Sequence, residues 1–200
     1  MNKKITLISV DVEATGPTPG KYSMLSLGAC VVGDTSRRFY RELKPISRGY
    51  VLEALKVGVI GLSSLPKVPA CDPRTDHFDA EQVMQAMRMN GAYPRRVMEE
   101  FRRWIADVAG ATSPIFASDT SVFDGMFTFW YLDNFTAKGN IFGHSGFSMN
   151  CFCKGAKGDL RANIKRMGIK APTGVLHNAL DDAVHHATVF EKIMARHRRT

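Results

Sequence analysis

One apolar stretch near the start of the chain ends in two acidic residues, and this feature constrains the fold more than any other. Residues 5–10 are apolar or β-branched except for Ser9, as in a β-strand buried on both faces. Asp11 and Glu13 follow, and residues i and i+2 of a strand point to the same face. Two carboxylates this close repel each other unless a proton or a cation lies between them. The stretch therefore predicts a metal site or, alternatively, two surface acids where a strand runs into solvent.

A metal site at this strand would need ligands from elsewhere in the chain, and two distant stretches supply acids. Hard divalent cations such as Mg²⁺ prefer oxygen ligands and also bind substrate phosphates. One stretch reads Phe-Asp-x-x-Phe and contains Asp124, and the other reads His-x4-Asp-Ala and contains His177 and Asp182. With the Asp-x-Glu strand, the chain carries three acidic motifs in a fixed order across most of its length.

In these three ordered motifs the chain resembles the DEDDh group of 3′→5′ exonucleases. This group includes proofreading exonuclease subunits, oligoribonuclease-like enzymes and ribonuclease T-like enzymes. The resemblance implies an α/β fold of the ribonuclease H-like kind, with a five-stranded mixed sheet and helices on both faces. It also implies an enzyme that hydrolyses phosphodiesters from the 3′ end and releases nucleoside 5′-monophosphates.

The resemblance implies four metal-binding carboxylates and one catalytic histidine. The carboxylates would hold two Mg²⁺ or Mn²⁺ ions about 4 Å apart, which suits in-line hydrolysis of a phosphodiester. Asp11 would bridge both ions. The imidazole of His177 would act as the general base, since a neutral imidazole can accept a proton near neutral pH. The complete set of site residues is Asp11, Glu13, Asp124, His177 and Asp182.

Two neighbouring acids compete with the assigned ligands. A helix points Asp181 and Asp182 about 100° apart, and the spacing in the family, five residues after the histidine, favours Asp182. The Phe-Asp-x-x-Phe context favours Asp124 over Asp119, which we interpret as a turn or cap residue. No other histidine has a spacing that requires a site. We expect surface or packing roles for His77, His144, His185, His186 and His197.

The expected partner is nucleic acid with a free 3′ end. The resemblance implies that Ala14, Thr15 and Gly16 bind the terminal nucleotide, with Ala14 and Thr15 using backbone amides and Thr15 its hydroxyl. A net charge of +8 and a pI near 9.5 agree with a polyanionic partner. The basic residues cluster in three segments, and the alternative interpretation of each is a solvated helix face. These segments are residues 95–103, 154–170 and 196–199.

The chain reads as a single exonuclease domain over residues 1–200, with an irregular helical insertion at about 45–92. Prolines and glycines interrupt the insertion, which has the length of a lid, a dimer surface or a decoration, so a homodimer stays open. No apolar run approaches the roughly 20 residues of a membrane span. The first strand leaves no room for a signal peptide, so we expect a cytoplasmic protein. No extra tail supports a polymerase partnership.

Hydrophobic periodicity and turn signals predict the order of the elements. Strands are expected near residues 4–13, 23–33, 36–43 and 114–117, with a fifth within 139–153. Helices are expected near residues 51–55, 79–87, 94–109, 122–135 and 160–167, and a last one carries Ala179 to Met194.

Two other functions stay open at this stage. One is an oligoribonuclease-like enzyme limited to short RNA. The other is a catalytically silent module that binds nucleic acid or a polymerase. Such a module would lack at least one of the five catalytic residues, and all five are present. This favours an enzyme, although the sequence does not distinguish DNA from RNA as its substrate.

Overall fold

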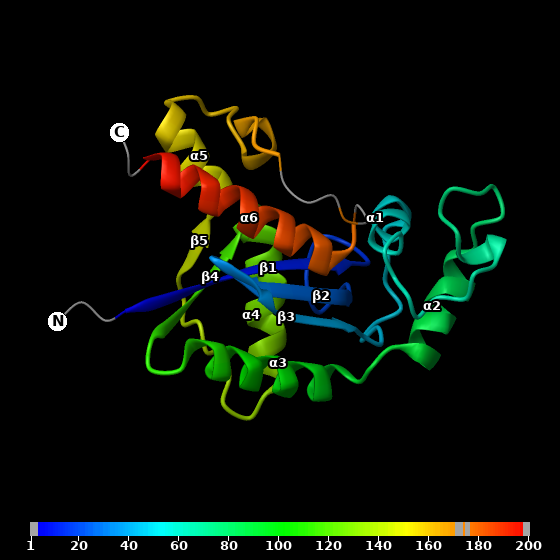
Figure 1. The fold of residues 1–200 in the computed structure, drawn as a ribbon. Helices are drawn as coiled ribbons and strands as arrows, with labels where there is room; N and C mark the ends of the chain where they lie inside the picture. Colours follow the sequence, from blue (N-terminus) through cyan, green and yellow to red (C-terminus); the bar gives the residue numbers. More distant parts are fainter. Residues whose placement is uncertain (1–3, 171–173, 175–176, 198–200) are drawn as a thin grey trace.

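A five-stranded mixed sheet forms the centre of the computed structural model, which describes residues 4–170, 174 and 177–197. Its strand order is β3-β2-β1-β4-β5 (Figure 1). The first three strands form an antiparallel meander, and the last two continue the sheet in parallel on the other side of β1. The meander and the mixed sheet confirm the prediction. The strands are β1 (Ile5–Ala14), β2 (Met24–Val31), β3 (Asp34–Glu42), β4 (Ser113–Ser118) and β5 (Gly146–Ser148).

Helices cover both faces of the sheet, as expected (Figure 1). Helix α6 (Ala179–His197) packs on one face against the first three strands. Helices α3 (Pro94–Ala109) and α4 (Ser121–Phe135) pack on the other face. The apolar residues of α3 recur at helical spacing, so one side of that helix enters the main core. None of the described helices combines the length and the apolar composition needed to cross a membrane.

The start of α6 lies directly on the sheet because β2 has a glycine at the contact. Gly28 pairs with Asp11 across the β1–β2 ladder. A side chain on Gly28 would overlap the backbone of Ala179. One turn further along α6, the carbonyl oxygen of Ala183 accepts a hydrogen bond from the Ser9 hydroxyl at 2.9 Å. This close approach brings the first turn of α6 to the acidic end of β1.

The insertion folds as two helices and a short 3₁₀ turn between β3 and α3. These elements are α1 (Leu52–Gly58), η1 (Pro69–Cys71) and α2 (Ala80–Asn90), so both helices predicted in this region are present. The insertion has its own buried apolar cluster, which Leu25 of β2 joins. The carbonyl oxygen of Gly61 accepts a hydrogen bond from the Asn178 side-chain amide at 2.9 Å. The insertion is therefore fastened to the start of α6.

The segment between β5 and α6 differs from the prediction. Helix α5 (Met149–Lys157) was not anticipated, and Ser148 caps it by accepting a hydrogen bond from the Cys151 N–H. The helix predicted at 160–167 is wrong, since only a 3₁₀ turn, η2 (Ile164–Met167), is formed there. The Asp159 carboxylate accepts a hydrogen bond from an N–H only two residues later, which makes a local turn instead of a helix cap.

Candidate active site

The five predicted catalytic residues meet in one pocket of about 470 Å³. The pocket lies where the end of β1, the start of α4, the start of α6 and η2 come together. Its volume falls in the range of small-molecule and nucleotide sites. Three segments that are far apart in the sequence therefore supply one site, as the ordered motifs implied. The five residues are Asp11, Glu13, Asp124, His177 and Asp182.

Strand geometry and one backbone hydrogen bond position the first three carboxylates. Asp11 and Glu13 share the face of β1 that Ser9 uses to contact α6. Asp124 lies in the first turn of α4 and is only 3% exposed. Its Oδ1 atom accepts a hydrogen bond from the Val12 N–H at 3.3 Å. Since Val12 stands between the two acids of β1, this bond ties Asp124 to them.

The first turn of α6 positions the other two residues. The Oδ2 atom of Asp182 accepts a hydrogen bond from the His177 backbone N–H at 3.0 Å. The Nδ1 atom of His177 lies 4.0 Å from Oε1 of Glu13, and the side chain is 36% exposed. His177 has a positive φ of 61°, a conformation that non-glycine residues seldom adopt. The histidine is thus held at the pocket rim, next to two of the carboxylates.

Asn178 is a site-supporting residue that the sequence analysis missed. Its side-chain oxygen accepts hydrogen bonds from the N–H groups of Leu180 and Asp181 at the start of α6. Its amide group donates to Gly61 of the insertion. An asparagine directly before a predicted helix is a typical N-cap signal. This cap sets where α6 begins, and hence where Asp182 points.

Burial and mutual repulsion shape the electrostatics of the pocket. Burial, followed by repulsion from Asp124, Glu13 and other acids, raises the pKa of Asp11 well above its usual range. Burial and the charges of Asp182 and Asp124 raise the pKa of Glu13 to about 9. The pKa of Asp124 is likewise raised, first by burial and then by Asp119. Carboxylates gathered in this way are the donor set that divalent cations need, because positive charge relieves the repulsion.

Two residues that we had assigned to other roles also lie in the pocket. His186 was expected to have a surface or packing role, but it lines the pocket and is 4% exposed. Its Nε2 atom lies 3.5 Å from Oδ2 of Asp119, and its Nδ1 atom lies 3.9 Å from Oδ1 of Asp11. Asp119 occupies a turn, as predicted, but caps no helix. One available signal was the spacing of Asp182 and His186, since residues i and i+4 share a helix face.

Asp181, the acid next to Asp182, is not among the residues that line the pocket, whereas Asp182 is.

Thr15 is one of the residues expected to bind the terminal nucleotide. It is fully buried, and its N–H donates to the carbonyl oxygen of Ser23. Its hydroxyl donates to the carbonyl oxygen of Gly49 at 2.8 Å. Both groups therefore have partners within the protein, and nucleotide binding by residues 14–16 stays a prediction.

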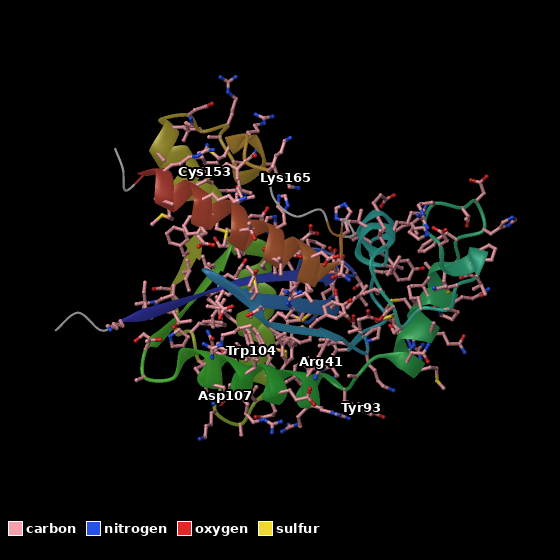
Figure 2. The ribbon with its side chains drawn as sticks, in the orientation of Figure 1. Arg41, Tyr93, Trp104, Asp107, Cys153 and Lys165 are labelled. Carbon is pink, nitrogen blue, oxygen red and sulfur yellow. The ribbon has the colours of Figure 1, made fainter. Side chains whose placement is uncertain are left out.

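The basic clusters differ in their relation to the pocket. Lys165, on η2, lines it and is exposed (Figure 2). The arginines of residues 95–103 lie on α3, on the opposite face of the sheet (Figure 1). One of them, Arg96, forms an ion pair with Glu100. Of these two clusters, the segment around η2 is the one next to the site, and residues 198 and 199 of the third cluster lie outside the described part of the chain.

Comparisons with known proteins agree with the resemblance to 3′→5′ exonucleases. No protein-family model matches the chain. The curated 3′-5′ DNA exonuclease Cap18 of Escherichia coli is 30% identical over 195 residues, which are 95% of this chain and 92% of that protein.

Among solved structures, zinc-bound E. coli exonuclease I with single-stranded DNA superposes with a TM-score of 0.62 at 12% identity. The match covers 98% of the present chain but only 42% of the exonuclease I chain. The nuclease domain of 3′hExo, a DEDDh family member bound to rAMP, has a TM-score of 0.60 at 12% identity. The match covers 96% of this chain and 92% of that domain.

Proposed function

The chain belongs to the DEDDh family of 3′→5′ exonucleases, and on this premise we propose that it removes nucleotides from the 3′ end of DNA by metal-dependent hydrolysis. The observation that carries the proposal is the convergence of the five family residues in one pocket. DNA is favoured as the substrate because the curated relative, similar over almost its whole length, is a DNA exonuclease. A catalytically silent module would not need to keep all five residues.

The carboxylates are proposed to hold two divalent cations, Mg²⁺ or Mn²⁺. Two such ions, when bound, activate water and stabilise charge on the phosphoryl oxygens and the leaving oxygen. Asp11 would be the residue that contacts both ions, because four other acids act on its carboxylate. The raised pKa values of Asp11, Glu13 and Asp124 support this assignment. They arise from burial and from neighbouring acids, and a bound cation would relieve this repulsion.

His177 is proposed to accept the proton of the attacking water. A general base must reach that water while remaining in contact with solvent to pass the proton on. The partly exposed imidazole, with Nδ1 4.0 Å from Oε1 of Glu13, supports this role. The backbone N–H of His177 donates a hydrogen bond to Asp182. The backbone that carries the imidazole is therefore bound to another residue of the site.

The rim of the pocket supports binding of a nucleic-acid end. Lys165 offers a positive charge for a phosphate. Phe123 also lines the pocket and is half-buried, so its ring is a candidate for stacking on a base. Ala14, Thr15 and Gly16 are proposed to bind the terminal nucleotide, which for Thr15 requires its present hydrogen bonds to open.

A digestion panel tests the substrate. Labelled single-stranded DNA, duplex DNA, single-stranded RNA and dinucleotides would be incubated with Mg²⁺ and, in parallel, with a chelator. We expect shortening of DNA from its 3′ end, full protection by a 3′-phosphate, and no effect of a 5′ block. Faster digestion of short RNA than of DNA would favour the oligoribonuclease-like alternative. Cleavage of closed circles would contradict exonuclease activity altogether.

A further inference from the structure

His186 is a buried side chain of the pocket with one ring nitrogen that forms no hydrogen bond to the described residues. It lies one turn after Asp182 on α6 and therefore on the same helix face. Its side chain is 5% exposed, and its Nδ1 atom has no hydrogen-bond partner among the described residues. A buried imidazole nitrogen without a partner is costly. This nitrogen is therefore a candidate to bind a group from outside the chain.

The charges around the ring define which nitrogen carries the proton. The carboxylates of Asp119 and Asp11 face the two ring nitrogens of His186. The shortest approach to a carboxylate is 3.5 Å, from Nε2 to Oδ2 of Asp119. This places the N–H on Nε2, directed at Asp119. The lone pair of Nδ1 is then left facing the Asp11 carboxylate.

The distance between Nδ1 and Asp11 suits a shared cation. The two atoms are 3.9 Å apart, which is too long for a hydrogen bond. Ligand atoms lie about 2.1 Å from a small divalent ion, so two ligands of one ion are at most about 4.2 Å apart. An ion between Nδ1 and Oδ1 of Asp11 could therefore contact both electron-rich atoms at this separation.

We propose that His186 Nδ1 and Asp11 bind one divalent transition-metal ion together, with Asp119 as a positioning residue that orients the imidazole through Nε2. Histidine ligands of metals commonly donate their other N–H to a carboxylate in this way. The inference rests on the proposed metal-dependent function but goes beyond it. It adds a nitrogen ligand to a site that the four family carboxylates make from oxygen alone.

The nitrogen ligand determines the ion that this position prefers. Imidazole suits zinc, copper, iron and nickel best, and oxygen ligands suit both Mg²⁺ and Mn²⁺. As a first-row transition metal, Mn²⁺ nevertheless accepts a nitrogen ligand more readily than Mg²⁺ does. Loss of the imidazole therefore weakens Mn²⁺ binding more than Mg²⁺ binding. We expect His186→Phe, which keeps a ring but lacks a nitrogen, to lower Mn²⁺ affinity by at least about 10- to 100-fold, the range seen on loss of a group that only supports a ligand, with a smaller change for Mg²⁺. Asp119→Asn should weaken Mn²⁺ binding in the same direction by a smaller factor.

Electron paramagnetic resonance of bound Mn²⁺ tests the nitrogen ligand directly, without any activity measurement. Electron spin-echo modulation from a histidine nitrogen should be present in the parent protein and in His177→Ala. It should disappear in His186→Phe and persist in the matched control His77→Ala, since His77 is exposed in the insertion. Circular dichroism of each variant verifies folding. If His186→Phe does not fold, loss or persistence of the signal in His177→Ala and His185→Ala assigns the nitrogen in otherwise intact protein.

Two outcomes would overturn the inference. One is Mn²⁺ bound to the parent protein without nitrogen modulation. The other is modulation that persists in His186→Phe or vanishes in His177→Ala. Either result, obtained with an enzyme that still requires a divalent cation to digest DNA, would leave the proposed function intact. Digestion that continues in chelator would instead contradict the proposed function itself.

Discussion

Replacement of Asp11 by asparagine is expected to slow release of the 3′-terminal nucleotide by about 10³-fold or more. The change keeps the shape of the side chain but removes the charge that is central to the carboxylate group. A metal ion contributes several kcal/mol of transition-state stabilisation, and about 1.4 kcal/mol corresponds to a factor of ten in rate. Single-turnover digestion of a 5′-labelled oligonucleotide measures the effect.

The adjacent acids of α6 provide a matched control for this experiment. Asp182→Asn should have an effect of similar size to Asp11→Asn, because Asp182 lines the pocket. Asp181→Asn should stay within about tenfold of the parent, since Asp181 is outside the pocket lining. Turnover by the Asp11 or Asp182 variant within tenfold of the parent would contradict the assignment of these carboxylates.

The thermal stability of Asp11→Asn, measured in the presence of a chelator, is a second test of this residue. The raised pKa values of Asp11, Glu13 and Asp124 mean that the native state holds protons that the unfolded chain loses above about pH 4. The free energy of unfolding must then fall as pH rises, up to the pKa of Glu13 at about 9. Asp11→Asn removes one of these groups. Its Tm should exceed that of the chelated parent at neutral pH and decline less steeply from pH 5 to 9.

Asparagine at position 177 is expected to lower turnover by about 10²- to 10⁴-fold, the usual range for loss of a positioned base. Asparagine tolerates the positive φ of 61° at this position better than alanine does, so the loop conformation is kept. The backbone N–H that binds Asp182 is also kept. Metal affinity should therefore change little, whereas Asp182→Asn should reduce it strongly.

The pH profile separates a base from a packing residue. A general base accepts a proton only in its neutral form, so the acid limb of the parent's profile should depend on the residue at position 177. His177→Asn should be slow at every pH and lack this imidazole-dependent decline. A His177→Asn enzyme that turns over like the parent, with an unchanged acid limb, would show that the base is elsewhere.

The sequence predicts the central part of this fold because its signals are local. The acidic end of β1, the meander and α6 follow from strand alternation, short turns and a regular apolar face. Helix α5 was missed because its nine residues include a glycine and two cysteines and overlap the glycine-containing stretch in which the fifth strand was expected. A helix was wrongly predicted at 160–167 because the Asp159 turn resembles a helix cap.

The part of the site that was missed depends on tertiary structure. Asp119 and His186 are 67 positions apart in the chain, and no local spacing links them. They meet only because Gly28 allows α6 to lie against the sheet beside the end of β4. The family motifs identify the residues that the resemblance names, but a contact that is particular to this chain requires the packing of the helix to be known.

Product analysis in water enriched in ¹⁸O tests the central claim most directly, namely metal-dependent hydrolysis from the 3′ end. A DNA oligonucleotide would be digested with Mg²⁺ or Mn²⁺, and the products of the first turnover identified by mass spectrometry. We predict a nucleoside 5′-monophosphate that carries one ¹⁸O atom, a shortened strand with an unlabelled 3′-hydroxyl, and no product in chelator. Release of a nucleoside 3′-phosphate, label retained on the strand, or equal release in chelator would contradict this account.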